Sequence, residues 1–71
     1  MDKIERMDLV RRGITVLRSQ YNQRKSCWMI AKATLNGGWT HFSTSWYLTR
    51  QDTDKKIDFI VSQNPDKIKK D

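Results

Sequence analysis

The side chains with the clearest chemical potential are aromatic rings interleaved with cations in the middle of the chain. Trp28, Trp39 and Tyr47 fall in runs that are typical of β-strands, and Lys32 and His41 lie between them. Exposed rings on a sheet stack on unpaired nucleic-acid bases, and each stacked base contributes roughly 1–3 kcal/mol. The same rings could instead bind a protein partner or support the sheet through cross-strand pairs.

Basic residues give a second indication of nucleic-acid binding. The chain has 14 Lys and Arg against 8 Asp and Glu, and its formal net charge is +6. Positive side chains release counterions from phosphates, so they give an affinity that falls as the salt concentration rises. Acidic residues interrupt this positive charge, and a solvated basic surface is the alternative. The cations expected to contact phosphate are Arg18, Arg24, Lys25 and Lys32.

The sequence contains no motif for catalysis, for a metal ion or for a cofactor. His41 is the single histidine, and the sequence identifies no nucleophile or orienting partner for it, so a structural or ligand-contacting role is favoured. Cys27 is the single cysteine and falls on the predicted core face, where a thiol behaves as a small hydrophobic group. P-loop, dinucleotide-binding and zinc-ligand patterns are missing. We therefore expect a binding protein rather than an enzyme.

The length and composition predict one small basic domain over residues 1–71. A chain of this size buries only about 60% of the surface that it exposes when unfolded, so self-association is a reasonable source of additional burial. The charged start of the sequence does not resemble a secretory signal, and no apolar run could cross a bilayer. These features, with one cysteine, favour a cytoplasmic protein without a membrane partner.

The first part of the chain is expected to contain a helix followed by a strand. Asp2–Arg12 is predicted to be helical, because Asp2 can cap its start and Gly13 can adopt the left-handed conformation that ends it. A run of three β-branched residues after Gly13 then favours a strand over Ile14–Tyr21, followed by a polar loop. A continuous apolar stripe supports the alternative of one long helix to about Asn22.

Two further strand-like runs predict a β-hairpin. Ser26–Leu35 and Trp39–Leu48 are separated by Asn36–Gly38, and Asn-Gly or Gly-Gly is typical of a two-residue hairpin turn. Such a turn pairs odd-numbered residues of the first run with even-numbered residues of the second. The hairpin therefore has one face without charge, which should be the core, and one open face.

The two expected faces differ in composition. The core face should contain Cys27, Met29, Ala31, Ala33 and Leu35 with Thr40, Phe42, Thr44, Trp46 and Leu48. The open face should contain Ser26, Trp28, Ile30, Lys32 and Thr34 with Trp39, His41, Ser43, Ser45 and Tyr47.

A second helix should follow the hairpin. Thr49 and Asp52 resemble a capping box, and Pro65 ends the helix near Gln63. Residues 66–71 are expected to form a frayed or short helical tail. The resulting α+β fold has the order α-β-β-β-α, with both helices on one face of an antiparallel sheet. The order becomes α-β-β-α if the first helix is long.

This predicted order resembles the topology of the double-stranded-RNA-binding domain and of the small RNA-cleaving toxins. The resemblance covers most of the chain without a supporting motif, so no site residue is carried over. The last helix of such RNA-binding domains begins with lysines, whereas this helix begins with Gln51-Asp52-Thr53-Asp54. The histidine of the toxins follows a Gly-Ser or similar pair, whereas His41 follows Trp39-Thr40.

We therefore expect the protein to bind DNA or RNA through the open face of the sheet. The alternative is a protein-interaction module (an adaptor, inhibitor or homodimer) that uses the same rings to contact a partner or a second copy. Only the first hypothesis predicts a steep loss of affinity with salt. The residues expected to contact nucleic acid are Trp28, Lys32, Trp39, His41, Tyr47, Arg18, Arg24 and Lys25.

Overall fold

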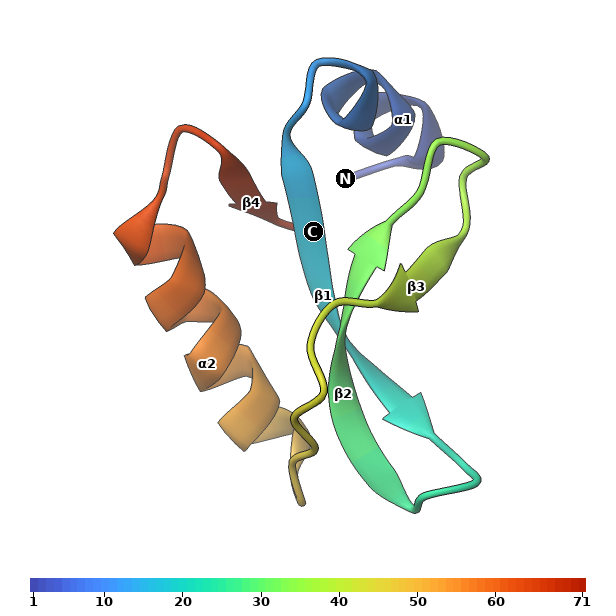
Figure 1. The fold of residues 1–71 in the computed structure, drawn as a ribbon, viewed down its shortest axis with the longest axis vertical. Coiled ribbons are helices and arrows are strands. Elements are labelled where there is room, and N and C mark those ends of the chain that lie inside the picture. The colour runs from blue at the N-terminus through green and yellow to red at the C-terminus, as the bar shows by residue number, and fades with distance from the viewer.

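The computed structural model describes all of residues 1–71 and contains two helices and a four-stranded mixed sheet (Figure 1). The strands lie in the order β3-β2-β1-β4, and only β1 and β4 run parallel. The predicted α+β class and the order α-β-β-β-α are confirmed, and β4 is an additional strand. The elements are α1 (Lys3–Arg11), β1 (Thr15–Asn22), β2 (Cys27–Ala33), β3 (Trp39–His41), α2 (Arg50–Gln63) and β4 (Ile68–Lys70).

Capping residues determine where both helices begin. The Asp2 side chain accepts a hydrogen bond from the Glu5 N–H at 2.8 Å, and the Thr49 hydroxyl accepts one from the Asp52 N–H at 3.0 Å. Gly13 has a φ of 85°, the left-handed conformation that turns the chain out of α1. The predicted helix starts and the strand after Gly13 are therefore confirmed, and the alternative of one long helix is wrong.

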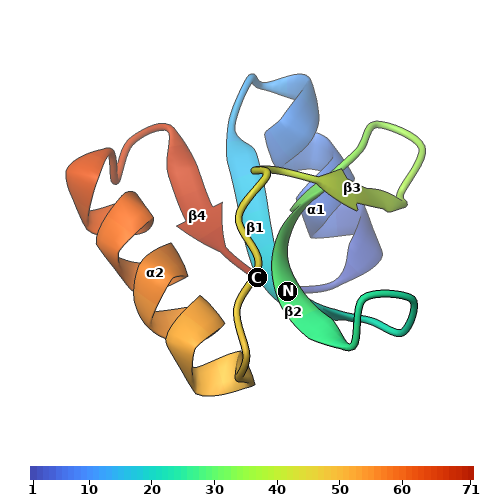
Figure 2. The same ribbon diagram turned by 60° about the horizontal axis from the view of Figure 1, so that its bottom comes forward.

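The two helices lie on opposite faces of the sheet (Figure 2), so the prediction that both cover one face is wrong. α2 covers the face that contains Leu17 and Ile30, against which its Ile57 is fully buried. α1 covers the other face, where Val16 and Ala31 are fully buried. Both faces of β1 and β2 thus carry apolar side chains, and each face requires its own cover.

The register of β2 and β3 differs from the prediction by one residue. Ala33 pairs with Trp39, so odd-numbered residues lie opposite odd-numbered residues. The Thr34 N–H donates to the Gly38 carbonyl at 3.0 Å, and Gly37 between them has a φ of 86°. The loop therefore has one residue more than the predicted two-residue turn. Because side chains alternate along a strand, this difference moves every residue of β3 to the opposite face.

The third strand is also shorter than predicted. β3 ends at His41, although the Phe42 N–H still donates to the Ile30 carbonyl at 2.9 Å. Residues 43–46 then leave the ladder, and Tyr47 returns to exchange two hydrogen bonds with Trp28. The predicted continuous strand to Leu48 and the core position of Trp46 are therefore wrong, and Phe42 and Tyr47 both pack on the α2 side.

The last residues form a strand instead of the predicted frayed or helical tail. β4 runs parallel to β1, with Ile68 opposite Thr15. The Ile68 side chain packs against the core under α2, while the Lys70 Nζ lies 3.0 Å from the Asp58 Oδ1 of α2. Burial of one apolar side chain and pairing with a free sheet edge explain why this short segment is extended. β4 covers only the first part of β1.

Candidate functional site

The aromatic face predicted from the sequence does not exist as one surface. Trp28 lies on the α2 side of the sheet, and Tyr47 pairs with it there. Trp39 and His41 lie on the α1 side, as the shifted register of β3 requires. Lys32 shares the α2 side with Trp28. The prediction that these five residues lie together is therefore wrong, and the residues divide into separate environments.

Trp39 contacts two guanidinium groups beneath α1. The Cζ atoms of Arg18 and Arg6 lie 4.0 and 5.0 Å from the centroid of its ring. Between β1 and β3 on this face, β2 presents the small side chains of Ala31 and Ala33, so Arg18 can reach across β2 to the ring. Such cation–π contacts stabilise by about 0.5–2 kcal/mol each. Trp39 thus connects α1 to the sheet.

Arg18 carries the most perturbed charge of the chain. Burial lowers the pKa of its guanidinium below the ordinary value, the Asp71 carboxylate raises it, and the positive charge of Arg6 lowers it again. Its side chain donates to the Gln20 Oε1 at 3.1 Å, while its Nε is buried without a partner. No carboxylate forms an ion pair with it. Within the chain, Arg18 is therefore held by an aromatic ring and a neutral amide, without a carboxylate partner.

Two aromatic pairs flank the end of the β1–β2 hairpin. The rings of His41 and Trp46 lie 4.9 Å apart, with His41 on the α1 side of the sheet. The rings of Tyr21 and Trp28 lie 5.5 Å apart on the α2 side, in an edge-to-face arrangement. Tyr21 is 47% exposed and Trp46 is 37% exposed. Each pair therefore includes a ring with solvent-accessible surface for a planar ligand.

A cation lies over one ring of each pair. The Lys25 Nζ is 5.6 Å from the centroid of Trp46, and the Arg50 Cζ is 6.0 Å from that of Trp28. Lys25 and its neighbour Arg24 are exposed in the turn between β1 and β2. Rings beside cations are the groups that hold bases and phosphates together. The following residues, which lie on both sides of the sheet, are together called the hairpin-end surface: Tyr21, Arg24, Lys25, Trp28, His41 and Trp46.

The acidic residues are all remote in sequence from this turn. None of the 8 Asp and Glu lies between Asp8 and Asp52, a stretch that contains the whole of β1, β2 and β3. Arg24 and Lys25 form no ion pair within the chain. This positional signal was readable in the sequence, although the net charge alone does not reveal it. Trp46 was missed for a different reason, because the assumed register assigned it to the core.

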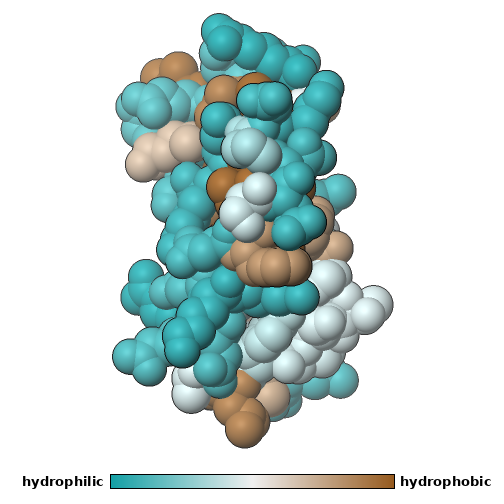
Figure 3. Space-filling model, turned by 90° about the vertical axis from the view of Figure 1, so that its left-hand side faces the viewer, coloured by the Kyte–Doolittle hydropathy of each residue, from teal (hydrophilic) through white to brown (hydrophobic).

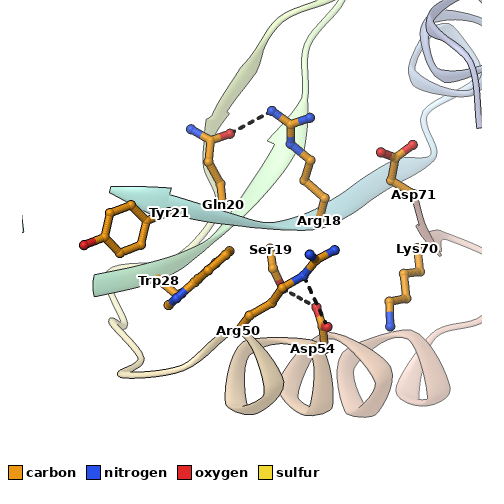
Figure 4. Close-up of a pocket in the computed structure, with 9 residues that line it drawn as sticks. All are labelled: Arg18, Ser19, Gln20, Tyr21, Trp28, Arg50, Asp54, Lys70 and Asp71. Atoms are coloured by element: carbon orange, nitrogen blue, oxygen red, sulfur yellow. Dashed lines mark hydrogen bonds and ion pairs between the residues drawn. The ribbon is translucent and has the colours of Figure 1, made fainter. Parts of the chain in front are cut away.

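An open groove of about 550 Å³ lies beside the end of β1 (Figure 4). Arg18 and Gln20 lie on one side of β1, and Ser19, Arg50 and Asp54 lie on the other side, between β1 and α2. The Ser19 hydroxyl donates to the Asp54 Oδ1, and the Arg50 Nε is 3.8 Å from the Asp54 Oδ2. The groove is lined mainly by polar and charged side chains, so it suits a polar ligand.

The outer side of the molecule over α2 offers no comparable surface. Its colouring is mostly hydrophilic, and hydrophobic groups appear as separate spots (Figure 3). Contiguous apolar patches are what mark apolar docking surfaces. This side therefore gives no support to a dimer formed through an apolar face.

Neither helix is both long and apolar enough to cross a membrane. No three His, Cys, Asp or Glu side chains are grouped so that they could hold a metal ion. The comparisons with known proteins found no matching family model, no matching curated protein and no matching solved structure.

Proposed function

We propose that the protein binds single-stranded nucleic acid through the hairpin-end surface. The observation that carries this proposal is the exposed Trp46 ring, which lies beside His41 and under Lys25, whose ammonium group forms no ion pair within the chain. The proposal keeps the expected class of partner but replaces the expected site. Trp39 no longer belongs to it, because its ring is engaged by α1.

The rings would bind unpaired bases by stacking. The Trp46 and Tyr21 side chains of this surface are 37% and 47% exposed. Stacking does not discriminate strongly among bases, because every base has a π-face, and it requires that the base is not inside a duplex. We therefore expect a preference for single strands over duplexes and little sequence specificity.

The turn between β1 and β2 would bind the phosphates. Its geometry is fixed by Asn22, whose side-chain oxygen accepts a hydrogen bond from the Lys25 N–H at 3.0 Å. Arg24 and Lys25 project from this turn into solvent with no carboxylate as a competing partner. A phosphate beside them would lie close to a base stacked on Trp46, because Lys25 is itself near that ring.

Fluorescence titration tests this function. Short single-stranded RNA and DNA should quench tryptophan emission, and the corresponding duplexes should bind more weakly. For single strands, the logarithm of the binding constant should fall with that of the salt concentration, with a slope of about −0.7 for each phosphate contacted. Absence of binding at low salt would exclude the proposed function.

Two variants show whether nucleic acid stacks on this surface or binds to any exposed aromatic ring. Trp46→Ala should weaken binding by roughly 5- to 150-fold, the loss expected for one stacked base. Phe59→Ala is the matched control, because Phe59 is 54% exposed and has the Lys56 Nζ 5.2 Å from its ring centroid, but lies on α2. Equal losses in both variants would contradict a site at the hairpin end.

A further inference from the structure

β1 extends beyond the strand that covers its outer edge. It includes Thr15–Asn22, whereas its pairing with β4 covers only Thr15–Leu17. The last hydrogen bond between the two segments joins the Asp71 N–H to the Leu17 carbonyl at 2.8 Å. The second half of β1 therefore has a neighbouring strand only on the β2 side (Figure 1).

The backbone of two residues in this half points towards the open edge. Alternate residues of a strand direct their N–H and C=O groups to opposite neighbours. Leu17 bonds on the β4 side, so Ser19 and Tyr21 direct their backbone groups to the same side, beyond the end of β4. Such unpaired groups are a template for an added strand. Both residues line the groove described above.

The acidic side chains of the groove already have partners. Asp54 accepts the hydrogen bond of Ser19 and lies near Arg50. The Asp71 Oδ1 lies 3.9 Å from a guanidinium nitrogen of Arg6. Neither carboxylate is therefore free to pair with a basic ligand without losing a contact inside the chain.

Of the three cations that line the groove, Lys70 has a close carboxylate partner in Asp58, whereas Arg18 and Arg50 do not. Arg18 stacks on Trp39 and donates to the neutral Gln20, but it forms no ion pair. The Arg50 side chain is 69% exposed, so its 3.8 Å contact with Asp54 leaves part of the guanidinium open to solvent. The two arginines lie on opposite sides of the β1 edge (Figure 4). Because side chains of an added strand also alternate between the two sides, a carboxylate on the α2 side would lie near Arg50, and one on the other side would lie on the face from which Arg18 extends towards Trp39.

We propose that the Ser19–Asn22 edge of β1 binds an extended acidic segment of a partner protein by strand addition. The main chain of the segment bonds to Ser19 and Tyr21, and its carboxylates pair with Arg18 and Arg50. Backbone bonds supply affinity in this mode, and the flanking side chains supply specificity. This site shares Tyr21 and Trp28 with the hairpin-end surface, but it does not involve Trp46 or the turn residues Arg24 and Lys25, so variants at Trp46 and in the turn test the proposed function separately.

Amide hydrogen exchange with a synthetic probe tests strand addition. The probe is a soluble peptide of alternating glutamate and valine, with a peptide of alternating lysine and valine as the control. In the free protein, the Ser19 and Tyr21 amides should exchange quickly, while the Gln20 amide, which faces β2, is protected. The acidic peptide should slow exchange at Ser19 and Tyr21, and the basic peptide should not.

Other outcomes overturn the proposal. Unchanged exchange at a saturating concentration of the acidic peptide excludes strand addition. Equal binding of the lysine peptide excludes an acidic partner. Protection that rises with protein concentration alone assigns the edge to a second copy of the chain, and protection of the same amides by single-stranded RNA assigns it to nucleic acid.

Substitution of the arginines provides an independent test. Arg18→Gln should weaken binding of the glutamate peptide by about tenfold, as expected for loss of a charge-assisted hydrogen bond. Since Arg18 also contacts Trp39, Arg50→Gln serves as a second variant at an exposed position, with a similar or smaller loss expected. If both variants bind the peptide as tightly as the wild type, the proposed charge recognition is wrong.

Discussion

Trp39 and Trp46 are both tryptophans with a cation over the ring, yet they lie in different environments. Arg18 and Arg6 approach Trp39 to 4.0 and 5.0 Å, and the second of them comes from the covering helix α1. Trp46 has only Lys25 at 5.6 Å and is 37% exposed. A tryptophan beside cations in the sequence therefore does not identify a binding site. The distinguishing feature is whether a second element of the fold covers the ring.

Replacement of Trp39 should have the largest effect, and the effect should be on stability. Trp39→Ala removes a half-buried ring and two cation–π contacts, so we expect the free energy of unfolding to fall by about 2–4 kcal/mol. Urea denaturation followed by circular dichroism measures this loss. A loss below about 0.5 kcal/mol, the range of ordinary surface substitutions, would mean that the ring does not connect α1 to the sheet.

Replacement of Trp46 should lower the affinity for nucleic acid and leave the stability of the fold almost unchanged. Trp46→Ala should change the free energy of unfolding by less than about 1 kcal/mol, because the ring is exposed and lies outside the ladder. Its affinity for single-stranded RNA should nevertheless fall, and Trp46→Phe should retain most of the affinity because it keeps a stacking ring. Unfolding and binding measured on the same protein samples decide between the two roles. A large loss of stability in Trp46→Ala would mean that Trp46, like Trp39, is a structural residue.

Removing the positive charges of the β1–β2 turn tests whether its cations bind phosphates beside Trp46. The double variant Arg24→Gln and Lys25→Gln should reduce the salt dependence of single-strand binding by about 0.7 in slope for each lost phosphate contact. Neutralising Lys55 and Lys56 on α2 removes the same charge as a control and should leave the slope unchanged. Fluorescence titrations over a salt series measure both. Equal changes in both variants would indicate attraction by net charge rather than by the turn.

The loop that sets the register of β3, and with it the side on which Trp39 lies, is tested at Gly37, where we expect an effect on stability alone. Gly37 has a φ of 86°, which an alanine adopts at a cost of about 1–2 kcal/mol. A Cβ there would also contact the Lys3 side chain, which is flexible and can move. Gly37→Ala should lower the melting temperature modestly without changing the hairpin. An unchanged melting temperature would contradict the left-handed conformation at this residue.

Local signals in the sequence were sufficient for the two helices and the first strand, but not for the length and register of the third strand or for β4. Asp2, Gly13 and Thr49 act within a few residues of their own positions, so the helix starts and the first strand were predictable. The side of the sheet on which Trp39 lies depends on one loop residue, and Asn36–Gly38 is compatible with more than one turn length. A single-residue difference in that loop was therefore enough to break up the predicted binding face.

Two further features depend on contacts between distant parts of the chain. Ile30 was assigned to the open face, yet it is fully buried under α2, because both faces of β2 are covered. β4 has only three residues, too few for a periodic pattern, and it becomes a strand by pairing with β1. The candidate site was predictable as a composition of rings and cations. Which rings and cations belong to the site was not predictable, because this depends on the strand register and on which side chains are buried.

The parallel pairing of β1 with β4 has a consequence for the order of folding. Thr15 and Ile68 are near opposite ends of the chain, so their pairing closes a long loop, whereas the β1–β2 hairpin closes a short one. Contacts of large sequence separation form late, since the entropy of closing the loop is lost before the contact is gained. During synthesis, β1 would therefore present its entire outer edge until residues 68–70 emerge and pair with it.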